Sequence, residues 1–159
     1  MPLMSAETML TRLSGALSPV GLAGFLGEVV DPYLRQRARG RFADEGDDVT
    51  GAWQPLKPAT QEIREQLGYG GAHPINIRTH ELEAYIVDSP NNLSAHPWGA
   101  TLTLPGNPAQ GELRDKMERA QQGDDRTAAR PVLGMNERDL AFVLLALGGF
   151  VKQFAMREL

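Results

Sequence analysis

Three histidines are the residues of this chain best suited to bind a metal ion or to transfer a proton. They are His73, His80 and His96, seven and sixteen residues apart. The spacing matches no HExxH motif or other common metal-ligand pattern. Two ligands on one strand face need i, i+2 spacing, and Leu82 occupies that position after His80. We therefore expect no metal site, and histidines that lie in turns or in solvent.

The serines, glycines and acidic pairs give no catalytic or phosphate-binding motif either. No serine lies in a GxSxG context, and neither GxxxxGK[ST] nor a helix-leading GxGxxG occurs. The acidic pairs Asp47-Asp48 and Asp124-Asp125 lack the ligand ladder of a calcium loop, so we interpret them as solvated loop charges. The absence of cysteine excludes disulfides, thiolate ligands and a Cys nucleophile. We expect no enzymatic activity and no cofactor.

Length and composition predict one soluble domain over residues 1–159. The chain is 42% hydrophobic and 23% charged, and its net charge of −4 argues against a general binder of nucleic acid or anionic membranes. No run approaches the roughly 18 apolar residues of a membrane span, and Pro19 and Glu28 interrupt the apolar stretch 16–30, which argues against a signal peptide. Residues 1–20 are a candidate N-terminal arm, and the proline-rich segment 88–111 is expected to be rich in loops. We expect the protein to be made and kept in the cytoplasm.

Apolar spacing predicts helices over residues 6–17, from about 21 to 45, over 58–67 and over 109–122. Asp31-Pro32 is interpreted as an N-cap pair that restarts or kinks the second helix. In the third helix, Ile63 and Leu67 are expected to face inward and Arg64 outward, and Gly68 to end the helix. Alternation over 80–90 and 98–106 predicts two strands, paired antiparallel. The fold class is therefore α+β: N-terminal helices, a small antiparallel sheet, and a long C-terminal helix packed on the sheet.

Four arginines occur within seven positions of the second predicted helix. They are Arg35, Arg37, Arg39 and Arg41. This stripe is either a solvated helix face or a basic contact for an acidic partner subunit or for nucleic acid.

The C-terminal helix is apolar on nearly every side. Asn136 is predicted as its N-cap, with Asp139 in the first turn, and LAFVLLAL follows. Such a helix needs two covers, so it is either a central core helix or a site of oligomerisation, and Leu144 and Leu147 are expected to matter for folding or assembly. Gly148-Gly149 predicts a break or a close backbone approach.

Two groups of residues together resemble the virion morphogenesis, or tail completion, family of tailed bacteriophages. The first follows the pattern RF…GxWxPLxxxTxxxR and the second the pattern ARPxxG. The residues are Arg41, Phe42, Gly51, Trp53, Pro55, Leu56, Thr60 and Arg64, and then Ala129, Arg130, Pro131 and Gly134, with Asp139 and the apolar helix behind them. The resemblance covers roughly residues 35–155.

The resemblance implies a structural protein of the head–tail junction in the virion, assembled in the host cytoplasm. Relatives with this role are thought to form rings, commonly six-fold, that contact the tail tube and head-connector proteins while DNA passes through without sequence-specific binding. Alternatives are a head-closure or minor tail component, and a small nucleic-acid-binding protein that uses the Arg35–Arg41 stripe.

The motif residues have both structural and interfacial interpretations. Trp53 and Leu56 anchor their loop on the core or serve as interface anchors. Arg64 and Arg130 pair with acidic groups within or between subunits. Pro131 and Gly134 are expected to set the turn before the last helix.

Overall fold

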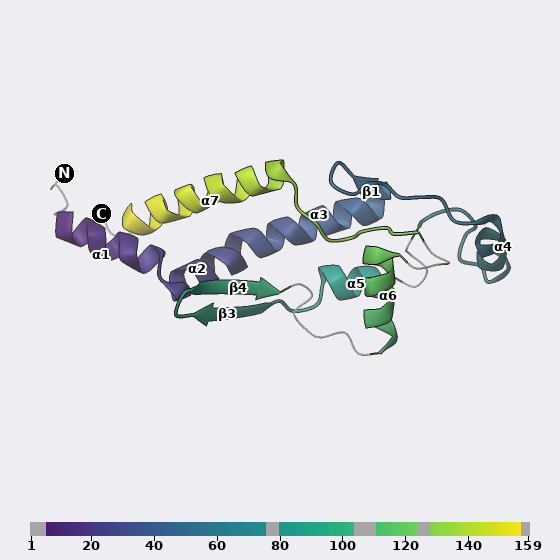
Figure 1. Ribbon diagram of the computed structural model, residues 1–159, viewed down its shortest axis with the longest axis horizontal. Helices are drawn as coiled ribbons and strands as arrows, with labels where there is room; N and C mark the ends of the chain where they lie inside the picture. The colour runs from purple at the N-terminus through teal and green to yellow at the C-terminus, as the bar shows by residue number, and fades with distance from the viewer. Residues whose placement is uncertain (1–5, 76–79, 104–110, 124–127, 157–159) are drawn as a thin grey trace. The chain divides into compact units, whose positions relative to one another are not determined.

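The computed structural model describes residues 6–75, 80–103, 111–123 and 128–156, which form an α+β fold (Figure 1). The helices are α1 (Ala6–Ala16), α2 (Pro19–Phe25), α3 (Asp31–Asp44), α4 (Pro58–Gln66), α5 (Glu81–Val87), α6 (Glu112–Gln122) and α7 (Glu137–Met156), with a π-helical turn, η1 (Leu26–Val30), before α3. The strands β1 (Gly46–Asp47) and β2 (Gly51–Ala52) form one antiparallel pair, and β3 (Asn92–His96) and β4 (Gly99–Thr103) form another. The chain divides into two compact units. Unit 1 comprises residues 1–33, 91–106 and 136–159, and unit 2 comprises residues 34–90 and 107–135.

Three of the predicted helices are confirmed as α1, α4 and α6. Gly68 and Gly123 follow the last turns of α4 and α6 with φ of 76° and 73°, a conformation that glycine adopts without a steric penalty. The orientation of α4 was predicted wrongly, because Ile63 and Leu67 are exposed and Arg64 is buried. Ile63 and Leu67 therefore do not anchor α4 to the rest of unit 2.

The helix predicted from residue 21 to 45 is continuous but contains a π turn. Asp31 is helical (φ −58°, ψ −52°) and donates its N–H to the carbonyl of Leu26, so its interpretation as an N-cap is wrong. Pro32 has no N–H to give, and a π turn directly before it lets the helix continue through the irregularity. The side chain of Asp31 instead accepts a hydrogen bond from Asn91 Nδ2 at 2.6 Å.

The segment predicted as a strand over 80–90 is the helix α5. The strand prediction placed Leu82, Ala84 and Ile86 on one face and Tyr85 on the other. In the helix, Leu82, Tyr85 and Ile86 stand at i, i+3 and i+4 and share the face that meets the core. The second predicted strand is confirmed as β4, whereas Leu104 and the Pro-Gly end of that prediction lie outside the described residues. The partner of β4 is β3, joined to it by the two residues Pro97 and Trp98, so the loop-rich segment holds a hairpin.

Unit 1 is built from α1, α2, η1, the first residues of α3, α7 and this hairpin. In Figure 1, α7 and the hairpin lie on opposite sides of α2 and η1. Helix α1 packs against α7, where Arg12 Nη1 donates to the carbonyl of Ala155 at 3.1 Å. Phe25 of α2 meets Phe150 of α7 with ring centroids 5.4 Å apart.

Unit 2 has the principal apolar core. Its fully buried members come from α3, α5 and three connecting segments: Ala38, Phe42, Trp53, Ile75, Ile86, Val87 and Val132. Leu56, Leu82, Tyr85, Met117 and Leu133 pack around them. This core holds the loops on which most of the motif residues stand.

Candidate functional site

The side chain of Arg41, from the last turn of α3, is the centre of a polar cluster inside unit 2. It is only 1% exposed. Its Nε donates to Asp47 Oδ2 at 2.7 Å, its Nη1 to the carbonyl of Val132 at 3.1 Å and its Nη2 to the carbonyl of Gly134 at 2.9 Å. One guanidinium therefore joins α3, β1 and the segment before α7.

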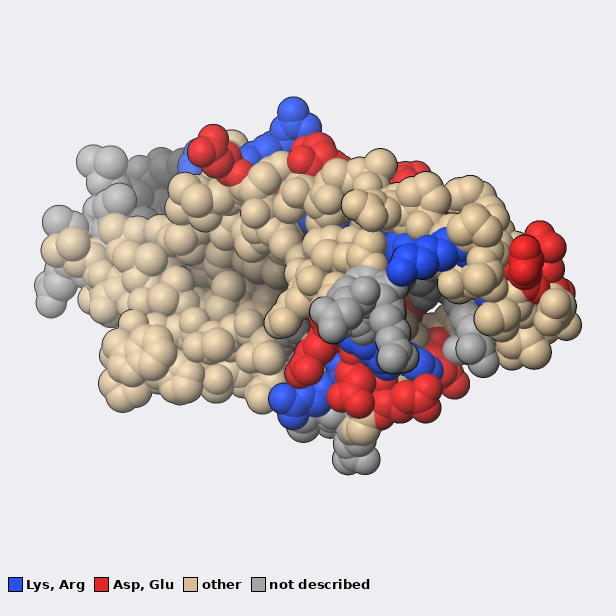
Figure 2. Space-filling model, turned by 45° about the vertical axis from the view of Figure 1, so that its right-hand side comes forward, with Lys and Arg blue, Asp and Glu red and all other residues tan. Residues whose placement is uncertain are grey.

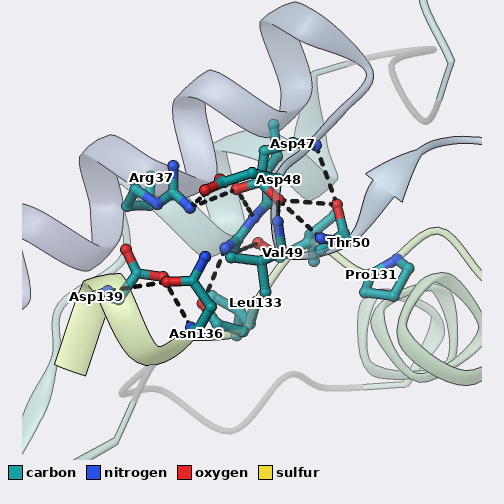
Figure 3. A network of polar contacts seen from close by, with 12 residues as sticks. Arg37, Asp47, Asp48, Val49, Thr50, Pro131, Leu133, Asn136 and Asp139 are labelled. Carbon is teal, nitrogen blue, oxygen red and sulfur yellow. Dashed lines mark hydrogen bonds and ion pairs between the residues drawn. The ribbon is translucent and has the colours of Figure 1, made fainter.

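Asp47 completes this cluster from the end of β1 (Figure 3). Its Oδ1 accepts the backbone N–H groups of Val49 at 2.8 Å and Thr50 at 2.9 Å, and Arg37 lies 3.1 Å from its Oδ2. Burial raises the pKa of Asp47, but these N–H groups and the Arg41 guanidinium outweigh burial and hold the pKa below its usual 3.8. The expectation that this acidic pair is solvated is therefore wrong for Asp47, whereas Asp124-Asp125 lies outside the described residues.

Trp53 and Arg130 attach the loop that carries the first motif to the segment that carries the second. The Trp53 ring packs edge-on against Phe42, with centroids 5.7 Å apart, and its Nε1 donates to the carbonyl of Pro131 at 3.2 Å. Arg130 donates through Nε to the carbonyl of Gln54 at 2.9 Å and through Nη2 to that of Pro55 at 3.2 Å. Burial lowers the pKa of Arg130. The structural interpretation of Trp53 is confirmed, and Leu56 packs against the same core.

The remaining motif residues of unit 2 lie at the edges of this arrangement. Thr60 is exposed on α4. Arg64 is buried and donates from Nη2 to the carbonyl of Tyr69 at 3.2 Å. Gly134 is exposed, and its contribution to the cluster is its backbone carbonyl.

Two further polar residues of unit 2 were not predicted from the sequence. Gln121 of α6 accepts the N–H groups of Val132 and Leu133 with its Oε1, at 3.2 and 3.3 Å, and donates to the carbonyl of Leu133. Glu45 contacts His73 Nδ1 at 2.7 Å and accepts the N–H of Ile75 at 2.8 Å. Burial raises the Glu45 pKa, but these partners and the nearby Arg64 charge lower it overall. Nothing local in the sequence marks either residue, because every partner is distant along the chain.

The arginines of α3 do not form a free basic stripe. Successive pairs at i, i+2 spacing point to different sides of a helix. Arg35 donates to the carbonyl of Val87, Arg37 pairs with Asp48 at 2.7 Å, and Arg39 pairs with Asp88 at 2.9 Å. Together with Arg41, all four side chains make contacts inside unit 2.

In unit 1, helix α7 begins with the predicted cap. Asn136 Oδ1 accepts the N–H of Asp139 at 2.9 Å, and Asp139 Oδ2 accepts the N–H of Asn136 at 3.0 Å (Figure 3). The Tyr33 hydroxyl donates to the other oxygen of Asp139. The Tyr33 ring also stacks on Phe142, with centroids 4.2 Å apart. Asp139 is buried, so this end of α7 is fixed within its unit.

Helix α7 has one covered face and one open face. Leu147, Phe150 and Phe154 are half-buried on the inner face. Leu144 and Leu145 are 59% and 79% exposed on the opposite face, so the interpretation as a central core helix is wrong. Gly148 and Gly149 neither break the helix nor approach any described atom, since nothing lies within 4 Å of a Cβ built on them.

Exposed apolar side chains also occur elsewhere in unit 1. Leu10, Leu17, Val20 and Trp98 are all exposed, and Trp98 at the hairpin tip is 80% exposed while stacking on His96. Of the 36 charged residues in the sequence, only 10 belong to unit 1 and 26 to unit 2. Figure 2 shows a broad uncharged surface on unit 1 and charged side chains gathered on unit 2.

Three remaining features concern a cleft, metal ligands and membrane-spanning helices. A cleft of about 380 Å³ lies between η1 and α7, lined by Glu28, Val29, Ala146, Gly149, Phe150, Gln153 and Phe154. Among the residues that the structure describes, no group of three His, Asp or Glu side chains could hold a metal ion. α7 is long and apolar enough to cross a membrane by length and composition only, and the bent pair Leu10–Ala16 with Pro19–Asp44 passes the same test.

Comparison with known proteins adds no relative: no family model, no curated protein and no solved structure matches the chain.

Proposed function

We propose that this chain is a structural virion protein of a tailed bacteriophage, a tail completion or neck protein whose oligomeric ring lets the tail and the filled head join. The observation that carries the proposal is the convergence of the motif residues. Arg41 and Trp53 of the first pattern donate to backbone carbonyls of residues 131–134, which carry the second pattern, and Phe42 packs against Trp53. Residue types at such wide spacing are expected to recur together only where they build one structural unit.

The contrast between the units supports an assembling subunit. Unit 2 uses its charged residues on partners of its own, whereas unit 1 exposes leucines on α7 and a tryptophan on its hairpin. Large exposed apolar surfaces are typical of proteins that function in contact with other chains. In this proposal unit 1 contributes to contacts within the ring and with the tail tube and head-connector proteins, and DNA passes through without sequence-specific binding.

The structure bears on one of the two alternative functions, the nucleic-acid-binding protein, and not on the other. A head-closure or minor tail component would use the same surfaces in a neighbouring ring of the virion. A nucleic-acid-binding protein would need the arginines of α3 to face a ligand. Because Arg37 and Arg39 pair with acidic residues and Arg41 is buried, the contacts of α3 weigh against this second alternative.

The test is complementation of virion assembly in vitro. Tails and filled heads are prepared from a phage in which the gene for this protein is inactivated, and the purified protein is added. We expect infectious particles to form, and electron microscopy to show a ring at the end of the tail tube. Unjoined heads and tails after addition of folded protein would contradict the proposal. DNA binding that falls with salt and with replacement of Arg35 and Arg39 would instead favour the nucleic-acid alternative.

A further inference from the structure

The open face of α7 carries a pattern that is complementary to itself. Its exposed residues recur at helical spacing along one stripe: Glu137, Ala141, Leu144, Gly148 and Lys152. Leu140, Leu145 and Gly149 are exposed beside them. The stripe therefore has an acidic end, a leucine centre, a small-residue segment and a basic end.

We propose that this face binds the same face of a second copy of the chain, with the two α7 helices antiparallel. An antiparallel pair centred between Leu144 and Leu145 brings Glu137 level with Lys152 of the second copy, about 22 Å along the helix. The same register sets Ala141 level with Gly148 of the second copy, so that small residues flank the central leucines on both sides. A parallel pair would instead place like charges together at both ends.

Several observations make a second copy the occupant of this face. Among the residues that the structure describes, neither Glu137 nor Lys152 has an ion-pair partner, and both are exposed, so a second copy can supply the opposite charge to each. The space beside Gly148 and Gly149 is open, which permits close approach of another helix. In a two-fold contact every pair of residues occurs twice, so the Glu137–Lys152 pair forms once at each end of the two helices.

The covered face of α7 argues against a lipid bilayer as the occupant. A helix that spans a bilayer alone meets lipid on all sides, whereas the inner face of α7 packs on Phe25 and its first turn is fixed by Tyr33 and Asn136. The covered inner face leaves the stripe from Glu137 to Lys152 for a neighbouring helix.

This inference goes beyond the proposed ring. A ring repeats one head-to-tail contact, whereas an antiparallel α7 pair is a two-fold contact between two copies. It also leaves Leu10, Leu17, Val20 and Trp98 exposed for other contacts of unit 1. One pair of helices is a small interface, so we expect association in the micromolar range.

Cysteine cross-linking tests the pair directly, because the chain has no cysteine of its own. In the proposed register, residue 144 lies beside the two-fold axis, so Leu144→Cys is expected to form a covalent dimer with a short bifunctional maleimide. The matched control is Leu67→Cys on α4 of unit 2, since Leu67 is 55% exposed and Leu144 is 59% exposed. A mixture of Ala141→Cys and Gly148→Cys chains is expected to cross-link to each other.

Charge reversal tests the register without disturbing the fold. In the Leu144→Cys background, Glu137→Lys and Lys152→Glu are each expected to reduce the dimer yield several-fold, because each replaces two attractive contacts by two repulsive ones. The double reversal restores both pairs and is expected to recover the yield. Circular dichroism and thermal unfolding of each variant show that the chains remain folded.

Three results would overturn the inference. The first is no cross-linking of Leu144→Cys at concentrations up to about 500 µM, well above a micromolar dissociation constant. The second is a double reversal that cross-links no better than the single reversals. The third is binding of the wild-type chain to phosphatidylcholine vesicles that Leu145→Glu abolishes, which would assign the face to lipid.

Discussion

The two units of the molecule differ in what they do with their charged and apolar residues. Unit 2 contains 26 of the 36 charged residues, buries Arg41 with three hydrogen-bond acceptors, and encloses a core around Phe42 and Trp53. Unit 1 contains only 10 charged residues and leaves Leu144, Leu145 and Trp98 largely in solvent. Apolar surface that a chain does not cover by itself gains free energy when another surface covers it. We infer that unit 2 provides stability of its own and that unit 1 completes its burial by association.

The largest expected effect is the loss of the Arg41 guanidinium from unit 2. Arg41→Met leaves the Asp47 carboxylate and the carbonyls of Val132 and Gly134 without their donor, and we expect the free energy of unfolding to fall by about 3 kcal/mol. The measurement is urea unfolding followed by circular dichroism. Arg39→Met is the matched control on the same helix, because the exposed Arg39–Asp88 pair is expected to contribute less than about 1 kcal/mol. Equal losses in the two variants would show that the buried cluster does not stabilise unit 2.

The two tryptophans give each unit its own probe. Trp53 is 5% exposed and donates to the carbonyl of Pro131, so we expect Trp53→Phe to lower the free energy of unfolding by about 2 kcal/mol through the lost hydrogen bond and the cavity. Trp98→Phe is expected to change it by less than about 0.5 kcal/mol, because the side chain is exposed.

Fluorescence sharpens the same comparison. The Trp98→Phe variant reports on unit 2 alone and should emit at shorter wavelength than the Trp53→Phe variant, whose remaining tryptophan is in water. A larger destabilisation by Trp98→Phe than by Trp53→Phe would reverse the assignment of the stable unit.

Much of the helical fold follows from the sequence, and the exceptions have physical causes. Helices α1, α4, α6 and α7 and the cap at Asn136 were predicted because apolar spacing and capping chemistry are local. The segment at Leu82–Ile86 was assigned to a strand because its short alternation fits both periods, and burial of one helical face in the unit 2 core decides between them.

The site was predicted only in part. The motif residues were identified by type and spacing, but the contacts of Arg41 and Arg130 with backbone carbonyls depend on which segments the fold brings together. Arg64 was expected on the surface because a charged residue is usually solvated. In the structure it is buried, and its Nη2 donates to the carbonyl of Tyr69. Leu144 is so exposed that Leu144→Asp is now expected to spare folding and to affect association.

Acid is expected to weaken unit 2 through its carboxylates. The pKa values of Asp47 and Glu45 in the folded chain lie below their usual values of 3.8 and 4.5, so their stabilisation is complete above those values and is lost as the pH falls through the folded pKa values. In the Trp98→Phe variant, where Trp53 reports unfolding, we expect the midpoint temperature to decrease once the pH is lowered below about 4. Asp47→Asn should have a lower midpoint at neutral pH and a flatter acid dependence. An unchanged acid slope in that variant would exclude Asp47 as its source.

Alanine at two glycines of unit 1 is expected to have effects of opposite sign. Nothing lies within 4 Å of a Cβ at Gly148, so Gly148→Ala is expected to raise the free energy of unfolding by about 0.5 to 1 kcal/mol by reducing the freedom of the unfolded chain. A Cβ at Gly21 would meet the carbonyl oxygens of Gly15 and Ala16 at 2.5 Å, so Gly21→Ala is expected to destabilise. Thermal unfolding measures both. A loss of stability in Gly148→Ala would mean that α7 is covered at the point where the structure shows it open.

The mass of the native particle tests the central claim most directly, namely that unit 1 completes its burial by association. Light scattering after size exclusion, over a wide range of concentration, is expected to give a multiple of 17.4 kDa that grows with concentration or closes at a fixed number of copies, six of which would fit the proposed ring. Leu145→Glu is expected to lower that mass, and Leu67→Glu to leave it unchanged. A particle of 17.4 kDa at every concentration would contradict the account.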